Sequence, residues 1–218
     1  MKQHLFLFGG GPPFTLQHAK KFIHLLKSDH PISILLVEKT GWQQYMPAYT
    51  QMLKDLGAAS FNYLPLPSTP LEQIKNSLCN SAGIIICGGN TTLYRDYIVD
   101  TPIAPILLDC YQSGIPIAGF SAGALICPDI CIISAKDNSE GKFQERKGLG
   151  LLKSTLLAVH FSEWKDEAHL HHAINELGEQ QNYGIDESAG IYFQNGEIDT
   201  IEGKGVYTIK NQQLLKMQ

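Results

Sequence analysis

The sequence contains little positive charge. Of its 218 residues only Arg95 and Arg146 are arginines, no basic run exceeds two residues, and the formal net charge is −4. A surface that binds nucleic acid or anionic lipid headgroups needs clustered Lys and Arg side chains. We therefore expect neither nucleic acid nor a membrane surface among the partners of this protein.

Long apolar runs are also missing. No run approaches the ~18 residues that a membrane-spanning helix needs, and residues 1–10 lack the layout of a signal peptide. The five cysteines are an odd number on mostly apolar segments, which is typical of reduced core residues: Cys79, Cys87, Cys110, Cys127 and Cys131. These features predict a cytoplasmic protein.

Metal-ligand spacings are scarce. Cys127 and Cys131 are four residues apart, but no second pair completes a zinc motif. Asp166, His169 and His172 recur every three residues and would share one helix face, for which a solvated polar face is the favoured interpretation. We expect no metal and no cofactor.

What the chain does have is enough apolar side chain for one core. Hydrophobic residues make up 44% and charged residues 17%, and a single α/β domain over residues 1–218 is the expected organisation. Apolar segments alternate with helical patterns up to residue 87, which predicts a parallel sheet. Short strands with turn signals after residue 183 predict an antiparallel extension that closes one side of this sheet. Residues 135–150 are expected to form a long surface loop, and Ser162 is expected to cap a helix that runs to Leu177.

The clearest chemical signal lies in residues 115–124. A short apolar run enters Gly-Phe-Ser-Ala-Gly at residues 119–123, the pattern of a nucleophile elbow. In such an elbow a strained serine ends a strand, and the flanking glycines avoid collisions with the neighbouring strand and helix. Ser121 is therefore the candidate nucleophile and the amide of Ala122 a candidate oxyanion donor. The alternative is a tight strand-to-helix turn that happens to carry serine.

Two further apolar strands end in residues that suit acyl transfer. Residues 83–87 lead into Gly88, Gly89 and Asn90, a second loop of exposed amides, and residues 156–159 lead into His160. We expect His160 at the same sheet edge as the elbow, where it would act as the base that a serine nucleophile requires. Acidic residues lie between Ser121 and His160, and this order suits a catalytic triad.

Four segments together resemble the peptidase E (aspartyl dipeptidase) and cyanophycinase family of serine peptidases. They read Gly-Gly-Asn-Thr at 88–91, Gly-Phe-Ser-Ala-Gly-Ala at 119–124, His-Phe at 160–161 and Gly-Ile-Asp-Glu at 184–187. The resemblance implies a flavodoxin-like, mostly parallel sheet flanked by helices, related to class I glutamine amidotransferases. It also implies hydrolysis of small peptides by acyl transfer, with a homodimer as one option for assembly.

The resemblance also implies individual roles. Relatives carry the triad acid shortly after the strand that follows the elbow helix, a location that Asp137 matches best, while Asp129, Glu140 and Glu145 stay open. The Gly88-Gly89-Asn90 loop resembles the family's oxyanion loop, and Asn90 would also cap the next helix. Asp186 and Glu187 follow another strand end and are candidates to orient a neighbour of His160 or to contact substrate.

One departure from the family bears on specificity. In the aspartyl dipeptidase branch an arginine after the catalytic histidine helps to hold the substrate's aspartate, because a guanidinium matches a carboxylate in a bidentate way. Residues 161–175 contain no arginine, and Lys165 is their one fixed cation. We therefore expect a small-peptide hydrolase without a strict preference for N-terminal aspartate.

Three other functions remain open from the sequence. A non-peptide amidase or esterase would use the same elbow, and a non-catalytic flavodoxin-like binding module would carry Ser121 as a relic. A subunit resembling glutamine amidotransferases is disfavoured, because Ser121 stands where that chemistry needs a cysteine thiolate.

Overall fold

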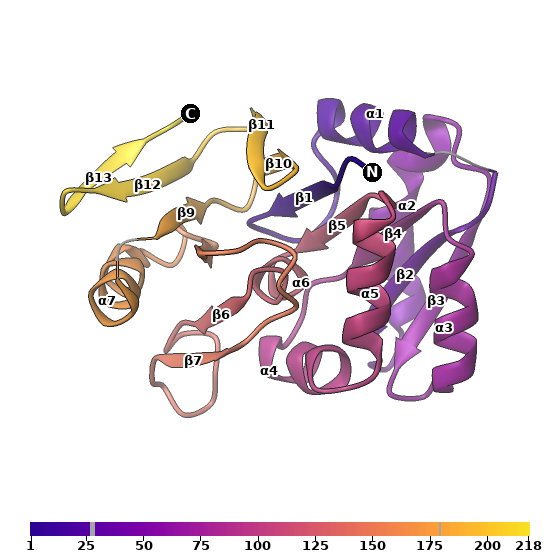
Figure 1. Ribbon diagram of the computed structural model, residues 1–218, viewed down its shortest axis with the longest axis horizontal. Helices are drawn as coiled ribbons and strands as arrows, with labels where there is room; N and C mark the ends of the chain where they lie inside the picture. The colour runs from indigo at the N-terminus through magenta and orange to yellow at the C-terminus, as the bar shows by residue number, and fades with distance from the viewer. Residues whose placement is uncertain (27–28, 179) are drawn as a thin grey trace.

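A computed structural model describes residues 1–26, 29–178 and 180–218. Its centre is a seven-stranded sheet with the strand order β11-β10-β1-β5-β4-β2-β3 (Figure 1). The strands are β1 (His4–Phe8), β2 (Ile32–Val37), β3 (Phe61–Leu66), β4 (Gly83–Ile86), β5 (Ile117–Phe120), β10 (Gly190–Gln194) and β11 (Glu197–Glu202). The five strands from β1 to β3 in this order pair in parallel, and β10 and β11 pair antiparallel. This confirms the predicted mostly parallel α/β sheet with an antiparallel extension.

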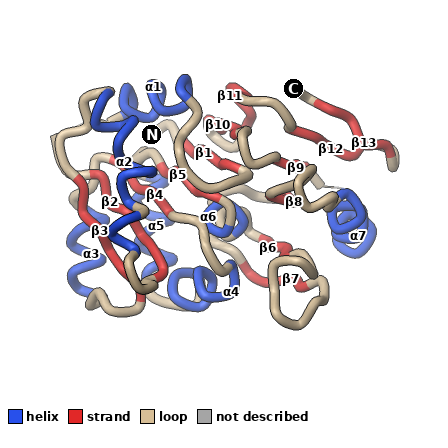
Figure 2. Tube along the Cα trace, turned by 180° about the vertical axis from the view of Figure 1, so that it is seen from behind, coloured by secondary structure: helices blue, strands red, loops and turns tan. Residues whose placement is uncertain are grey.

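Helices cover both faces of this sheet. The α-helices are α1 (Leu16–Leu25), α2 (Met46–Asp55), α3 (Leu71–Cys79), α4 (Thr91–Tyr94), α5 (Ile103–Gln112), α6 (Ala122–Leu125) and α7 (Glu167–Leu177). A 3₁₀ turn, η1 (Trp42–Gln44), precedes α2, and a π-helical turn, η2 (Arg95–Val99), continues α4. The two opposite views show α3 and α5 on one face and α2 on the other (Figures 1 and 2). No helix in the described part of the chain is long and apolar enough to cross a membrane.

The central strands are buried because both of their faces are covered. Every residue of β1, β4 and β5 is buried. Beneath the carboxyl end of β5, the ring of Phe120 stacks on Phe8 with 4.5 Å between centroids and also contacts Phe14 and Tyr49. These large buried rings give the elbow a rigid base, because close-packed side chains leave little room to shift.

A second sheet contains the strand that carries the candidate base. Its order is β13-β12-β9-β8, formed by β8 (Thr155–Val159), β9 (Gln181–Ile185), β12 (Val206–Lys210) and β13 (Gln213–Lys216). Helix α7 packs on it and contributes Leu170, Ala173 and Ile174 to a separate small core. The sequence suggested that the strand before His160 belongs to the same sheet as the elbow. It does not, because β8 pairs in parallel with β9 in the second sheet.

Two local expectations differ from the structure. The segment 135–150 is not all loop, because β7 (Gln144–Lys147) pairs antiparallel with β6 (Ile130–Ile133). Helix α7 begins at Glu167 with Asp166 as its N-cap, rather than at a cap formed by Ser162. The reason is local, since Lys165 has φ of 51° and a left-handed residue cannot be part of an α-helix. All five cysteines are free, and only Cys79 is exposed.

Candidate active site

Ser121 occupies the turn between β5 and α6, as the elbow pattern predicts. Its backbone has φ 47° and ψ −110°, an unfavourable region for a residue with a side chain. The two flanking glycines are sterically required. A Cβ on Gly119 would lie 2.6 Å from the carbonyl oxygen of Gly123, and one on Gly123 would lie 2.3 Å from that of Ile86. The amide of Ser121 also donates to the carbonyl of Phe8 at 3.0 Å, which ties the elbow to β1.

His160 reaches Ser121 from the second sheet. Its Nε2 lies 2.8 Å from the Ser121 hydroxyl, so the pair is within hydrogen-bonding distance. The backbone of His160 also has positive φ, 48°, and its amide donates to the carbonyl of Gly9 at 3.0 Å. The indole of Trp164 stacks on the imidazole, with 4.5 Å between centroids and an angle of 18° between the planes. These contacts leave the imidazole little freedom to rotate away from Ser121.

The carboxylate on the other side of His160 belongs to Glu187. Its Oε1 lies 2.7 Å from His160 Nδ1, which completes a hydrogen-bonded chain of serine, histidine and acid. Glu187 follows β9, the strand that pairs with β8, so pairing of the two strands brings the two side chains together. The amide of Glu187 donates to a carboxylate oxygen of Glu163 at 3.2 Å.

Asp137 does not occupy the position expected for the triad acid. Its Oδ2 accepts a hydrogen bond from the Thr91 hydroxyl at 2.5 Å, and burial raises the pKa of its carboxyl. The loop after β6 therefore directs Asp137 toward the start of α4, while Glu187 takes the Nδ1 side of His160. Glu187 was among the sequence candidates, as a residue at a strand end. The signal for its role is the Gly-Ile-Asp-Glu segment at the end of the strand that pairs with β8.

The loop after β4 has a fixed geometry. The Gly88 amide donates to the Tyr49 hydroxyl at 3.0 Å, and the Tyr94 hydroxyl donates to the Gly88 carbonyl at 3.2 Å. In a trans peptide the next amide, that of Gly89, points away from that carbonyl. Asn90 caps α4 by accepting from the Leu93 amide at 3.0 Å, as predicted.

The second candidate oxyanion donor is Ala122, the buried first residue of α6. Within the described part of the chain, neither its amide nor that of Gly89 donates a hydrogen bond to a protein acceptor. Amides without a protein acceptor, placed beside a nucleophile, can hold a developing oxyanion.

Asp186 stabilises the turn that follows His160. It is buried, and its Oδ1 accepts from the Ser162 amide at 2.8 Å. Gly205 makes room for it, because a Cβ there would lie 1.8 Å from Asp186 Oδ2. Asp186 thus fixes the turn that follows His160, while the adjacent Glu187 contacts the imidazole itself.

The Asp166, His169 and His172 pattern does not form a metal centre. The Asp166 carboxylate pairs with Lys136 at 3.3 Å, and burial lowers the pKa of His169. Among residues 1–26, 29–178 and 180–218, no group of three His, Cys, Asp or Glu side chains is placed to hold a metal ion.

Within the described part of the chain, neither arginine forms an ion pair with a residue of the serine–histidine–acid chain. The Arg95 guanidinium pairs with Asp96 and Asp100, and Arg146 lies on β7. Lys165 is exposed at the turn before α7, where its carbonyl accepts from Lys136 Nζ at 3.3 Å.

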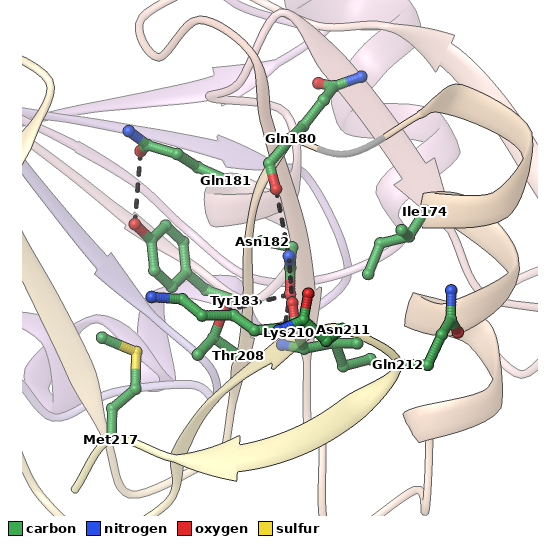
Figure 3. Close-up of a pocket in the computed structure, with 11 residues that line it drawn as sticks. Ile174, Gln180, Gln181, Asn182, Tyr183, Thr208, Lys210, Asn211, Gln212 and Met217 are labelled. Carbon is green, nitrogen blue, oxygen red and sulfur yellow. Dashed lines mark hydrogen bonds between the residues drawn. The ribbon is translucent and has the colours of Figure 1, made fainter.

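A cavity of ≈ 490 Å³ lies between α7 and the second sheet (Figure 3). Asn182 at its centre donates to the carbonyls of Gln180 and Ile209 and accepts from the Ile209 amide. The side-chain amide of Asn182 thus links β9 to β12, which is a structural role. None of the candidate catalytic residues lines this cavity.

Comparison with known proteins identifies related sequences. The sequence profile of Peptidase family S51 matches residues 5–201. Cyanophycinase of Nostoc sp. (strain PCC 7120) is 25% identical over 168 residues, which cover 74% of this chain and 56% of that protein. The chain thus spans little more than half the length of this relative. The uncharacterized peptidase YgaJ of Bacillus subtilis (strain 168) is 25% identical over 208 residues, covering 91% of this chain and 86% of YgaJ.

Two solved structures share the fold. A peptidase from an acI-B1 Actinobacterium superposes with a TM-score of 0.75 at 19% identity, covering 99% of this chain and 95% of that one. A Listeria monocytogenes EGD-e protein assigned as a peptidase E gives a TM-score of 0.66 at 20% identity, covering 93% and 98%. The likeness extends over almost the whole chain, so it includes both sheets.

Proposed function

The chain belongs to peptidase family S51, and from this premise we propose that it is a serine peptidase that hydrolyses small peptides through Ser121, His160 and Glu187. One observation carries the proposal. The Ser121 hydroxyl lies 2.8 Å from His160 Nε2, and His160 Nδ1 lies 2.7 Å from Glu187 Oε1. A serine hydroxyl is a weak nucleophile unless a positioned base removes its proton, and this chain of contacts supplies one.

The proposed reaction is acyl transfer. His160 takes the Ser121 proton as the serine oxygen bonds to the carbonyl carbon of the substrate. His160 then gives that proton to the leaving amine as the C–N bond breaks. Water then attacks the acyl-enzyme in the same two steps, with His160 taking the proton of the water. The carboxylic acid product leaves, and the proton returns to Ser121. Glu187 holds the imidazole in the tautomer with its proton on Nδ1 and stabilises the imidazolium that forms.

The amides of Gly89 and Ala122 are the proposed oxyanion donors. Each such donor typically contributes about 3 kcal/mol to the transition state. The Gly88 amide donates to the Tyr49 hydroxyl and the Gly88 carbonyl accepts from the Tyr94 hydroxyl, so both polar groups of this residue are held by the protein. That arrangement supports the proposal, because a preorganised donor needs no rearrangement during the reaction.

We further propose that the enzyme lacks a strict preference for an N-terminal aspartate. Arg95 is already paired with two aspartates, and residues 161–175 contain no arginine. The segment after His160 therefore offers no guanidinium to hold a substrate carboxylate in the bidentate way, and Arg146 lies on β7.

Labelling by a fluorophosphonate probe, combined with a peptide hydrolysis assay, tests the function. We expect the probe to label the wild-type protein and the exposed-serine control Ser68→Ala, and not Ser121→Ala. We also expect hydrolysis of short peptides to be lost with the label. Labelling that persists in Ser121→Ala, or hydrolysis of esters without any of peptides, would contradict the proposal.

A further inference from the structure

A small cavity opens next to the loop that carries Gly88. Its volume is ≈ 90 Å³, and its walls come from the carboxyl ends of β2 and β4, from η1 and α2, and from Pro12 after β1. Ligands in parallel α/β sheets bind at the carboxyl ends of the strands. The cavity therefore lies at the sheet edge where Ser121 also ends its strand.

We propose that this cavity binds the aliphatic side chain of the substrate residue that supplies the acyl group. The inference rests on the proposed peptidase function, since it assigns the cavity to a substrate of Ser121. It adds a chemical class of substrate, namely peptides with a leucine-sized or valine-sized residue before the scissile bond.

The strand order places the cavity on the acyl side of the bond. β5 lies between β1 and β4. His160, which must reach the leaving amine, is attached on the β1 side through Gly9. Gly88 lies on the β4 side, where a Cβ would lie 3.4 Å from Ser121 Cβ and 3.7 Å from the Tyr49 hydroxyl. A substrate carbonyl carbon at Ser121 would have its amine toward His160 and its oxygen toward the proposed donors Gly89 and Ala122. Its remaining substituent, the Cα with its side chain, then lies on the β4 side, next to Gly88 and the cavity.

The polar groups in the cavity floor already form hydrogen bonds within the protein. Tyr94 donates to the Gly88 carbonyl and accepts from the Val37 amide, and the Tyr49 hydroxyl accepts from the Gly88 amide. Burial raises the pKa of the Cys87 thiol, which keeps it uncharged. A substrate carboxylate in this floor would lose its hydration and find no cation and at most the hydroxyl proton of Tyr49 as a donor, which is unfavourable. An aliphatic side chain has no such cost.

The mouth of the cavity carries the one cation among its walls. Lys39 Nζ lies over the Tyr45 ring, 4.1 Å from its centroid. This cation–π contact holds the ammonium at the rim. Lys39 is exposed, so its ammonium stays solvated rather than entering the apolar floor.

Size narrows the class of side chain. An apolar cavity of about 150 Å³ accommodates benzene, whereas this one measures ≈ 90 Å³. Phenylalanine would therefore need a wall to move, and leucine or valine would not. Trp42 is the wall best suited to test this, because it is half-buried and packs on Tyr63 at 5.8 Å between centroids.

The test compares kcat/KM for dipeptides X-Ala, in which X is Leu, Val, Ala, Phe or Asp. We expect Leu or Val to exceed Ala by about 10-fold or more, since each added methylene in a fitted pocket contributes roughly that factor. Trp42→Ala should raise the Phe-to-Leu ratio by about 10-fold. The control Phe143→Ala removes a half-buried ring near α7 and should leave the ratio unchanged. A preference for Asp, a ratio unmoved by Trp42→Ala, or selectivity only for the leaving residue would overturn the proposal.

A binding measurement separates this proposal from the peptidase function. The chain has two tryptophans, so in a Ser121→Ala, Trp164→Phe protein the fluorescence reports Trp42. We expect leucine amide to change it saturably and at lower concentration than aspartate amide. If no peptide is hydrolysed but leucine amide binds in this way, the proposed function fails and the cavity assignment stands. If leucine amide causes no saturable change, the cavity assignment is wrong whatever the hydrolysis shows.

Discussion

Ser121 and Glu187 lie at opposite ends of one hydrogen-bonded chain but in different surroundings. Ser121 stands on the main sheet, in a turn whose glycines have no room for a Cβ. Glu187 follows β9 of the second sheet, and 53% of its side chain is exposed. Ser121, the proposed nucleophile, is therefore positioned by close packing, and Glu187, the proposed acid, by a short surface turn. The comparison teaches that one half of this site tolerates less change than the other.

The two halves meet through the glycines that follow β1. A Cβ on Gly9 would lie 2.2 Å from the carbonyl oxygen of Ile185, and one on Gly10 would lie 2.6 Å from that of Glu187. Only a chain without side chains lets the main sheet approach β9 this closely. The Gly-Gly-Gly turn at residues 9–11 thus joins the part of the site that carries Ser121 to the part that carries His160 and Glu187.

The largest expected effect comes from breaking the chain at its centre. Ser121→Ala and His160→Ala should each lower kcat by roughly 10⁴–10⁶, and the double variant little more, because the pair acts as a unit. Single-turnover and steady-state kinetics on one peptide measure this. Losses that multiply in the double variant would show that the two residues act independently.

The second-largest expected effect distinguishes the two candidate acids, Glu187 and Asp137, by the loss of kcat when each is neutralised. Glu187→Gln should lower kcat by about 10²–10⁴, because a neutral amide no longer holds the required imidazole tautomer. Asp137→Asn should change kcat by less than about 10-fold, since its carboxylate bonds Thr91 rather than His160. Rates for both variants, with circular dichroism as the control for folding, decide between them. The reverse ranking would return the acid role to Asp137.

The junction itself offers a matched pair of variants. Gly10→Ala should cost about 10²-fold in kcat, because a shift near 1 Å between base and nucleophile has that effect. Gly11→Ala is the control, since nothing lies within 4 Å of its added Cβ. Equal activity of the two variants would show that the turn does not set the distance between the halves.

The smallest effect concerns acid stability and compares one histidine from each region. Burial lowers the pKa of His18, against the main sheet, and of His169, on α7. Glu202 beside His18 and Asp166 beside His169 oppose this without reversing it. Because the unfolded state then binds more protons below its pKa of about 6.5, the free energy of unfolding should fall as pH drops through that value.

The fall is at most about 1.4 kcal/mol per pH unit for each histidine. Urea unfolding between pH 7.5 and 5.5 measures it, and His18→Gln and His169→Gln should each flatten the curve. His24→Gln removes an exposed histidine on α1 and should leave the slope as it is. An equal slope in all three variants would contradict the role of burial.

Features that depend on a few consecutive residues could be predicted from the sequence alone. The elbow was recognisable in Gly119-Phe120-Ser121-Ala122-Gly123 because the serine and both of its flanking glycines lie within five consecutive residues, although contacts with β1 and β4 also hold it. Continuous apolar runs such as β1 and β4 predicted buried parallel strands, because a strand covered on both faces needs no polar residues. Asn90 was predictable as a cap for the same local reason.

The tertiary structure decided which carboxylate faces His160. Asp137 fits the expected order in the chain, yet Thr91, 46 residues away in sequence, binds its carboxylate. Glu187 lies 27 residues beyond His160 and meets it through the pairing of β8 with β9, in a second sheet that no local pattern distinguished from the first. Strand pairing and the contact of two sheets through Gly9 and Gly10 depend on long-range packing. Residue spacing alone therefore located the proposed nucleophile but not the carboxylate that contacts His160.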